Sequence, residues 1–268
     1  MDDTASNPQT NAVAIIPARY GSMRLPGKPL LEIAGRPMIL WVIERARAAR
    51  NVARVVVATD DRRILEAVRS AGFEAVMTRE DHASGSDRLA EVAATLDDAE
   101  VIVNVQADEP LISSLTIERA VDELSGTTEA SIVTSYEVIR EASEVLSPDV
   151  VKVVMDEKGR ALYFSRSPIP YPRDAVREHG TLAAALDADP SLVALFRKHT
   201  GFYAYRRRFL IEYAGWPQST LERAESLEQL RALERGVIIK VFEAQTPSIG
   251  VDTAEDLERV RAIIGGKL

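Results

Sequence analysis

The sequence predicts an α/β fold with a mixed, mainly parallel sheet, flanking helices and a smaller inserted subdomain. Short β-branched apolar runs alternate with amphipathic stretches of helical period through the first half of the chain, which is typical of a parallel sheet covered by helices. This alternation breaks near residue 137 and returns towards the end. A chain of 268 residues can form one large domain, or one domain with an insertion.

The first half of the chain contains five expected strands and four expected helices. Pro37 suits a first helical turn, and Gly72 suits the end of a helix. The expected strands are 12–17, 54–59, 74–78, 101–106 and 130–136, and the expected helices are 37–50, 62–72, 86–96 and 113–126.

The second half departs from this pattern. Residues 151–166 are typical of a hairpin with Lys158 and Gly159 in its turn. A proline-rich segment follows, and the later elements are a strand at 201–207, a helix at 219–236 ended by Gly236, a strand at 237–244 and a helix at 253–264 capped by Thr253. We therefore expect a flexible tail at 1–11, a core at 12–136, a subdomain at 137–218 and a return to the core at 219–268.

Composition excludes several classes of protein. The chain has 41 acidic and 33 basic side chains and a net charge of −8, so it lacks the broad basic surface of a sequence-independent nucleic-acid binder. It has no cysteine for a disulfide or a thiolate metal site. The first eleven residues lack the basic and apolar parts of a secretory signal, and no apolar run is long enough to span a bilayer. We expect a soluble, cytoplasmic protein without a membrane partner.

The loop at 18–30 carries three cations, Arg19, Arg24 and Lys28, directly after the first expected strand. It is not a Walker A loop, because its two glycines have five residues between them and a proline follows the lysine. The chain has no G-x-G-x-x-G fingerprint either. The cations either pair with surface acids, or they form a phosphate site together with backbone N–H groups around Gly21 and Ser22, because open α/β sheets bind ligands at the carboxyl ends of their strands.

Two acidic residues are candidates for a metal site beside that loop. Asp108 follows the apolar run at 101–106, and Asp252 follows a short strand-like segment just before a helix. Carboxylate oxygens suit a hard cation such as Mg²⁺. Either acid can instead cap a helix, a part for which Glu255 or Asp256 is better placed at the last helix.

Seven segments occur in the same order as in the 3-deoxy-manno-octulosonate (Kdo) cytidylyltransferases, and the resemblance spans about residues 12–264. These segments are PARYGSMRLPGKPL, HASGSDRLAEV, VNVQADEPLI, ALYFSR, RKHTGFYAY, ESLEQLRALERG and GVDTAEDLERVR. The resemblance implies a nucleotide-diphospho-sugar-transferase-like (Rossmann-like) fold. It also implies a Mg²⁺-dependent transfer of CMP from CTP to Kdo, with release of diphosphate, for lipopolysaccharide synthesis, and a homodimer.

The resemblance also implies a role for individual residues. It makes 12–136 the CTP-binding core, 137–218 the sugar-binding and dimerisation subdomain, and 219–268 the part with a sugar-contacting helix and a metal-binding acid. The implied catalytic residues are Arg19, Lys28, Asp108 and Asp252, of which Asp108 and Asp252 hold Mg²⁺. The implied CTP-binding residues are Pro17, Ala18, Arg19, Ser22, Arg24, Lys28, Ser84, Gly85, Ser86, Arg88 and Gln106. The implied Kdo-binding residues are Arg166, His199, Tyr203, Glu228 and Gln229.

Simpler roles stay open for the implied Kdo residues. Arg166 and Tyr203 suit packing or a hairpin edge, His199 suits a satisfied buried histidine, and Glu228 and Gln229 suit the solvated face of one helix.

The sequence departs from the family pattern at two single positions and in the stretch between Arg166 and His199, which is longer than in typical members and is expected to alter the subdomain or the dimer edge. Ser86 stands where threonine is usual, and Ala107 where glycine is usual. Glycine often permits a close approach or unusual backbone angles, so Ala107 brings the local geometry into question. Two other functions remain: a cytidylyltransferase for a related acid sugar, 8-amino-Kdo or a nonulosonate, and a non-catalytic nucleotide-binding protein.

Overall fold

The computed structural model describes residues 11–21, 25–82 and 84–266, and the chain falls into two compact units. Unit 1 comprises the chain up to Gly126, Phe202–Gly215 and the chain from Thr246 onward, and unit 2 comprises Thr127–Gly201 and Trp216–Gln245. Within the described ranges, no helix has the length and apolar character needed to cross a membrane.

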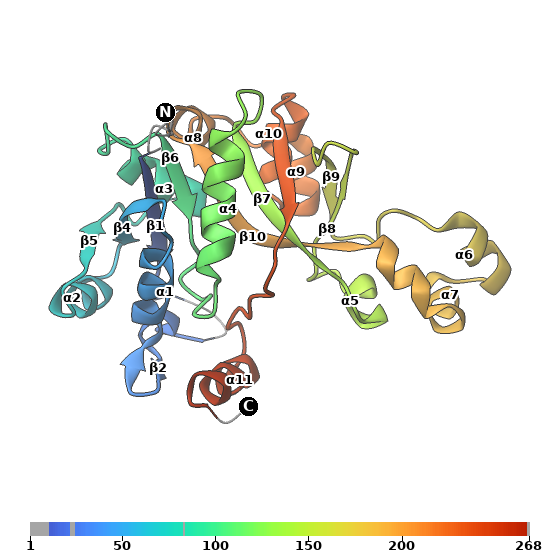
Figure 1. Ribbon diagram of the computed structural model, residues 1–268, viewed down its shortest axis with the longest axis horizontal. Helices are drawn as coiled ribbons and strands as arrows, with labels where there is room; N and C mark the ends of the chain where they lie inside the picture. Colours follow the sequence, from blue (N-terminus) through green and yellow to red (C-terminus); the bar gives the residue numbers. More distant parts are fainter. Residues whose placement is uncertain (1–10, 22–24, 83, 267–268) are drawn as a thin grey trace, which may run out of the picture. The chain divides into compact units, whose positions relative to one another are not determined.

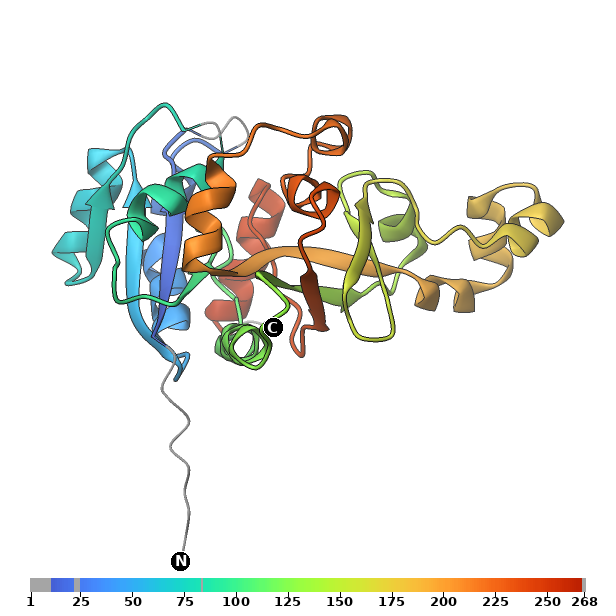
Figure 2. The ribbon, with the colours of Figure 1, turned by 90° about the horizontal axis from the view of Figure 1, so that it is seen from above.

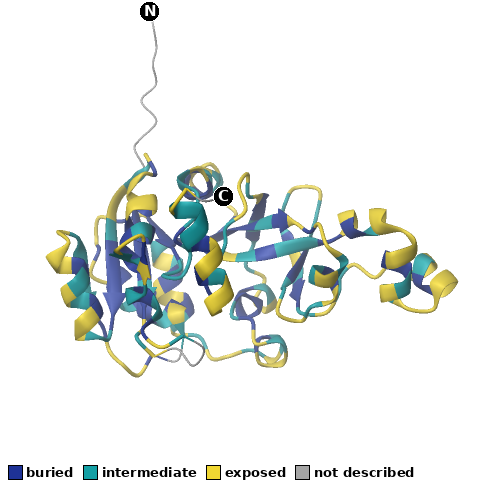
Figure 3. Cartoon of the chain, turned by 90° about the horizontal axis from the view of Figure 1, so that it is seen from below, coloured by how far each residue is buried: buried dark blue, intermediate teal, exposed yellow. Residues whose placement is uncertain are grey.

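Unit 1 is built on a sheet in which β1 lies in the middle (Figure 1). β1 is parallel to β4 on one side and to β6 on the other, β5 extends the sheet beyond β4, and the C-terminal half of β10 pairs antiparallel with β6. The β-branched and small residues of β1 are buried along almost its whole length, as a central strand with both faces covered requires (Figure 3). The strands are β1 Ala12–Ala18, β4 Val52–Thr59, β5 Glu74–Met77, β6 Val101–Asn104 and β10 Arg197–Arg206.

Helices cover both faces of this sheet. α1 and α4 lie on one face, and α3 and α8 lie on the other (Figure 2). The helices of unit 1 are α1 Met38–Arg47, α2 Arg62–Ser70, α3 Gly85–Ala93, α4 Ser114–Ser125, α8 Arg207–Ala214 and α11 Ala254–Ile264. The short elements η1 Lys28–Leu30, β2 Glu32–Ile33 and β3 Arg36–Pro37 lie between β1 and α1. The predicted order of strands and helices is confirmed here, whereas α8 and the β2–β3 ribbon were not predicted.

Unit 2 contains a parallel pair, β7 and β11, and an antiparallel hairpin, β8 and β9, whose strand β8 also pairs with the first half of β10. Gly159 has a φ of 73° in the hairpin turn, which confirms the turn predicted at Lys158 and Gly159. The strands are β7 Ile132–Val138, β8 Lys152–Met155, β9 Ala161–Ser165 and β11 Ile239–Glu243. The helices are α5 Ala142–Leu146, α6 Arg173–His179, α7 Leu182–Ala188, η2 Pro190–Leu195, α9 Thr220–Glu225 and α10 Gln229–Glu234.

Three details of the prediction are wrong. The helix expected at 219–236 is two helices, because Ser226 adopts a left-handed conformation (φ 53°) that ends α9. Pro37 is the last residue of β3 and caps α1, rather than lying in its first turn. The unit boundaries also differ from the expected ones: β7 belongs to unit 2 because it pairs with β11, and 202–215 belongs to unit 1.

Candidate active site

The loop after β1 is closed at its base and delivers Lys28 to the edge of unit 1. The Gly27 N–H donates to the Tyr20 carbonyl at 2.9 Å. Gly27 has a φ of 68°, and a Cβ atom there would lie 3.0 Å from the Tyr20 ring, so the closure requires glycine. Ser22 and Arg24 lie outside the described residues.

Lys28 lies between the two acidic residues that the sequence singled out. Its Nζ donates to Asp108 Oδ2 at 2.6 Å and to Asp252 Oδ1 at 3.1 Å, although the residues are 80 and 224 positions away along the chain. The Lys28 side chain is 14% exposed, against 33% for Asp108 and 55% for Asp252. Burial alone lowers the pKa of the Lys28 ammonium, but the two carboxylates outweigh it and raise the pKa above its usual value. The lysine is therefore fully charged at neutral pH.

Asp252 lies just before α11, and its carboxylate takes no part in the capping box of that helix. Thr253 and Asp256 form a capping box, and the Asp256 carboxylate accepts the Thr253 and Asp252 N–H groups. The Val251 N–H donates to the Asp108 carbonyl at 2.9 Å, which ties the two acidic segments together. Asp256 is therefore the helix-start acid, as the sequence suggested.

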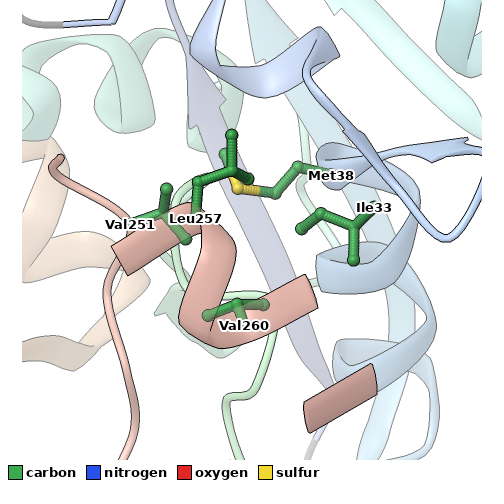
Figure 4. Close-up of a cluster of buried hydrophobic side chains, with 5 residues drawn as sticks. All are labelled: Ile33, Met38, Val251, Leu257 and Val260. Atoms are coloured by element: carbon green, nitrogen blue, oxygen red, sulfur yellow. The ribbon is translucent and has the colours of Figure 1, made fainter. Parts of the chain in front are cut away.

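An apolar cluster fixes this segment against the rest of unit 1. α11 packs on the β2–β3 ribbon and on the start of α1, and the buried side chains meet in one group (Figure 4). Its members are Ile33, Met38, Val251, Leu257 and Val260. Val251, the residue before Asp252, is fully buried in this cluster. Core packing therefore fixes the position of Asp252.

The pair Asp108 and Asp252 fits a magnesium ion in its donor chemistry. Their oxygens already converge on one cationic nitrogen, Lys28 Nζ. Mg²⁺ in nucleotide sites takes one or two carboxylates and completes its coordination with phosphates and water. No group of three or more His, Cys, Asp or Glu side chains in the described part of the chain suits a metal. The two acids therefore suit an ion that arrives with a phosphate ligand.

Asp60 connects two of the predicted nucleotide residues. It follows β4 directly and accepts a hydrogen bond from the guanidinium of Arg88, which also donates to Thr78 Oγ1. Arg19 Nε lies 4.0 Å from the same carboxylate, and Arg19 Nη2 donates to the His82 carbonyl at 2.6 Å. Asp60 was not predicted, although its place after a strand is the signal that identified Asp108.

The N-terminus of α3 carries the third predicted segment. Ser84 caps the helix in a capping box with Asp87, Gly85 is its first residue, and Ser86 is buried. Arg88 has no exposed surface, and its Nε has no hydrogen-bond partner among the described residues. Pro17 and Ala18 end β1, and Gln106 lies two residues beyond β6.

Ala107 fits its place without the freedom of glycine. Among the non-glycine residues that the structure describes, positive φ angles occur at Ala34 and Ser226. The backbone at Ala107 therefore lies in a region open to any residue, and the expected need for glycine is not supported by its angles.

Arg166 is held by backbone carbonyls and a neighbouring segment of unit 2. It follows β9, and its Nε donates to the Glu225 carbonyl at 2.8 Å, while Nη1 donates to the Pro148 carbonyl at 3.0 Å. No carboxylate of the described ranges forms an ion pair with its guanidinium. Its charge is thus left for another anion.

The remaining predicted sugar residues have distinct environments. Glu228 caps α10, and Gln229 is the first residue of that helix and is buried, so a solvated mid-helix face is wrong for Gln229. Gln229 Nε2 has no hydrogen-bond partner among the residues with described positions. Tyr203 lies in the part of β10 that belongs to unit 1 and stacks on Tyr205, with ring centroids 5.6 Å apart.

His199 is a buried, neutral histidine. Its Nε2 lies 2.9 Å from Thr134 Oγ1, and its ring contacts Phe164 edge-on. Burial lowers its pKa to about 3, so at neutral pH the imidazole ring forms its hydrogen bonds in the uncharged state.

We expect His199 to make folding less favourable in acid. Between pH 6.5 and about 3 the unfolded chain binds a proton at this histidine and the folded chain does not, so stability falls as the pH falls through that window. From pH 7 to pH 5 the wild type should lose roughly 2 kcal/mol more than His199→Asn. Urea unfolding of both proteins at the two pH values measures this, and equal losses would contradict the burial of a neutral ring.

Comparisons with known proteins show the family of this chain. A family model described as cytidylyltransferase matches residues 13–242, so the chain is a cytidylyltransferase by class. Relatives called 3-deoxy-manno-octulosonate cytidylyltransferase are 50% identical in Trichlorobacter lovleyi and 52% identical in Pseudomonas fluorescens, each over 93% of this chain and 96% of the relative. The chain belongs to the 3-deoxy-manno-octulosonate cytidylyltransferase family.

Solved structures show the same fold. CMP:2-keto-3-deoxy-manno-octonic acid synthetase complexed with CTP matches with a TM-score of 0.86 and 45% identity, over 97% of this chain and 100% of that one. A 4-diphosphocytidyl-2C-methyl-D-erythritol synthase from Anaerococcus prevotii shares the fold at a TM-score of 0.61 and 13% identity, over 96% of this chain and 97% of that one. The predicted mixed α/β fold is confirmed.

Proposed function

We propose that this protein transfers CMP from CTP to Kdo, with CMP-Kdo and diphosphate as products. The observation that carries the proposal is the convergence of Lys28, Asp108 and Asp252 at the edge of unit 1, in a chain about half identical to enzymes named for this reaction. A cation between two carboxylates, one just beyond β6 and one just before α11, suits the triphosphate and its metal.

The reaction is an in-line displacement at the α-phosphorus of CTP. The anomeric hydroxyl of Kdo forms the new P–O bond, and the bond to the departing diphosphate breaks, so the protein mainly positions the reactants and neutralises charge. Lys28 binds the leaving diphosphate. Arg19 binds the triphosphate and is oriented by the His82 carbonyl. Arg24 and Ser22 are proposed to assist in the same loop.

Asp108 and Asp252 are the proposed ligands of Mg²⁺. When bound, the ion would offset the negative charge of the phosphates and lower the pKa of the attacking hydroxyl. The two carboxylates would hold the ion, and with the ion bound the attacking hydroxyl would need no side-chain general base. This agrees with His199, whose lowered pKa makes it a poor proton acceptor.

The nucleoside part of CTP is assigned to unit 1. The N-terminus of α3 presents Ser84, Gly85 and Ser86, and Arg88 is held next to them by Asp60. Pro17, Ala18 and Gln106 at the strand ends complete the proposed nucleoside pocket. An α/β sheet binds nucleotides at this edge in general.

Two of the residues assigned to the sugar acid, Arg166 and Gln229, keep unused hydrogen-bonding capacity. Arg166 uses two of the five N–H donors of its guanidinium on carbonyls and forms no ion pair with the described acids, which suits a carboxylate ligand. The Nε2 group of the buried Gln229 amide is a donor that lacks an acceptor in the described structure, which suits a sugar hydroxyl. His199, Tyr203 and Glu228 are the other proposed contacts.

We further propose a homodimer in the cytoplasm whose product serves lipopolysaccharide synthesis. The resemblance to the family supports this proposal. Unit 2 also exposes large apolar side chains that a second copy of the chain would bury in such a dimer. They are Val138, Leu146, Leu162, Tyr171 and Leu195.

Diphosphate release by the purified protein with CTP and Mg²⁺, with and without Kdo, tests the function. We expect release that requires Kdo and that EDTA abolishes. Release with 8-amino-Kdo or a nonulosonate but not with Kdo would keep the enzyme class and change the substrate. CTP binding without release for any of these sugars would refute an enzymatic function and favour a nucleotide-binding protein.

A further inference from the structure

Unit 2 contains a completely buried cation that the proposed reaction does not use. Lys152 lies in β8 with no exposed surface. Its Nζ donates to the carbonyls of Ser147, Val150 and Arg166 at 2.8, 2.6 and 2.6 Å. An ammonium has three N–H donors, so all of them are used. No acid in the described part of the chain forms an ion pair with it, and burial lowers its pKa.

A buried ammonium whose three hydrogen bonds all go to neutral carbonyls, and which the Glu225 carboxylate attracts only from farther away, is costly to remove from water, which argues against packing as its purpose. An apolar side chain of similar size would fill the same space without the cost of removing an ammonium from water. What an ammonium adds is three directed hydrogen bonds to carbonyls in two separate segments. Lys152 thereby ties the turn at 147–150 to the residue that follows β9.

The turn at 147–150 also holds the guanidinium of Arg166. Its Nη1 donates to the carbonyl of Pro148, which lies within the turn that Lys152 binds. On its other side Nε donates to the Glu225 carbonyl, and the Glu225 carboxylate accepts the Arg166 N–H at 3.0 Å and the Ser165 hydroxyl at 2.7 Å. Lys152 thus fixes both the backbone of Arg166 and the carbonyl that orients its side chain.

We propose that Lys152 is the positioning residue for Arg166, and that its buried charge also helps to attract the carboxylate that Arg166 binds. This inference rests on the proposed function, in which Arg166 contacts the sugar acid. Because Nε and Nη1 of Arg166 already donate to carbonyls, the orientation of the guanidinium is fixed, and its outer edge is left for a bidentate contact with a carboxylate. A guanidinium that moves by about 1 Å loses the alignment of that contact, which is enough to cost on the order of 100-fold in rate in enzymes generally.

A double-mutant cycle on sugar-acid kinetics tests the proposal. Lys152→Met should raise KM for Kdo by about tenfold or more and leave KM for CTP within about twofold, because the lost alignment concerns the sugar acid alone. In an Arg166→Lys background, which keeps a charge but lacks the fork, the same substitution should raise KM for Kdo by less than about threefold. A purely structural role would produce equal effects in both backgrounds.

Lys158→Met is the matched control, because Lys158 is an exposed cation in the turn of the same hairpin. It should leave both KM values unchanged. If Lys152→Met does not fold, Lys152→Gln keeps two of the donors and is used in the same cycle. Equal increases in both KM values, additive effects, or an unchanged KM for Kdo would overturn the proposal for Lys152 alone. A wild type that releases no diphosphate with Kdo would overturn the proposed function as well.

Discussion

Asp108→Asn is expected to fold normally and to lose kcat by on the order of 100-fold or more, the size of effect seen when a preorganised electrostatic group is removed from an active site. Asparagine has nearly the same shape and keeps one oxygen, but it lacks the negative charge that we propose holds Mg²⁺ and that attracts Lys28 Nζ at 2.6 Å. The backbone carbonyl of Asp108, which accepts the Val251 N–H, is untouched. Initial-rate kinetics of diphosphate release and a thermal unfolding curve measure the two parts of this prediction.

The control is Glu255→Gln, which removes an exposed negative charge from the first turn of α11 without contacting Lys28. It should leave kcat within about twofold, because long-range effects of exposed charges are screened by salt. An Asp108→Asn enzyme with near wild-type kcat would refute the metal assignment. Rescue of its rate by a higher Mg²⁺ concentration would support the assignment directly.

Lys28→Ala is expected to raise KM for CTP by about tenfold to 100-fold, which corresponds to the loss of a hydrogen bond between charged groups. The same substitution should strengthen the binding of a metal ion, although it weakens the binding of CTP. Without the ammonium, Asp108 and Asp252 keep two negative charges that lie close to the same nitrogen position, at 2.6 and 3.1 Å from it. A divalent cation should therefore bind the CTP-free variant more tightly than the CTP-free wild type.

Electron paramagnetic resonance of Mn²⁺ titrated into the CTP-free proteins measures the second effect, and steady-state kinetics measure the first. Arg62→Ala removes an exposed cation at the start of α2 in the same unit and should change neither quantity. Unchanged CTP kinetics in Lys28→Ala would mean that the loop at 18–30 serves only to pair with acids of the protein. Weaker Mn²⁺ binding by the variant would contradict a lysine that competes with the metal.

Much of unit 1 could be predicted from local pattern. β1, β4 and α2 differ from their predicted ranges by at most two residues at either end, because a central parallel strand has a continuous apolar run and its helices carry one apolar face. The capping box at Thr253 and Asp256 was equally readable, since all of its groups lie within four residues. Local hydrogen bonds and periodicity are properties of a short segment.

The errors occur where long-range contacts decide. One helix was expected at 219–236 because its residues are good helix formers, yet Ser226 turns the chain, and Arg231 pairs in the interior with Glu222 of the preceding helix. The strand at 130–136 does continue the sheet, as expected, but its neighbours there are β10 and β11, and β11 comes more than a hundred residues later. Pairing of this kind leaves no mark in the strand's own sequence.

Some features of the candidate site could likewise be predicted from the sequence, whereas others depend on the tertiary structure. The sequence by itself determined the fold class, the cationic loop with Lys28, and the two acids Asp108 and Asp252, because each follows from residue type and position along the chain. The tertiary structure alone decided that Lys28 bridges Asp108 and Asp252, that Asp60 joins Arg19 to Arg88, and that Lys152 holds Arg166. These are distances between segments far apart along the chain, and packing of the whole unit sets them, whereas residue order leaves them open.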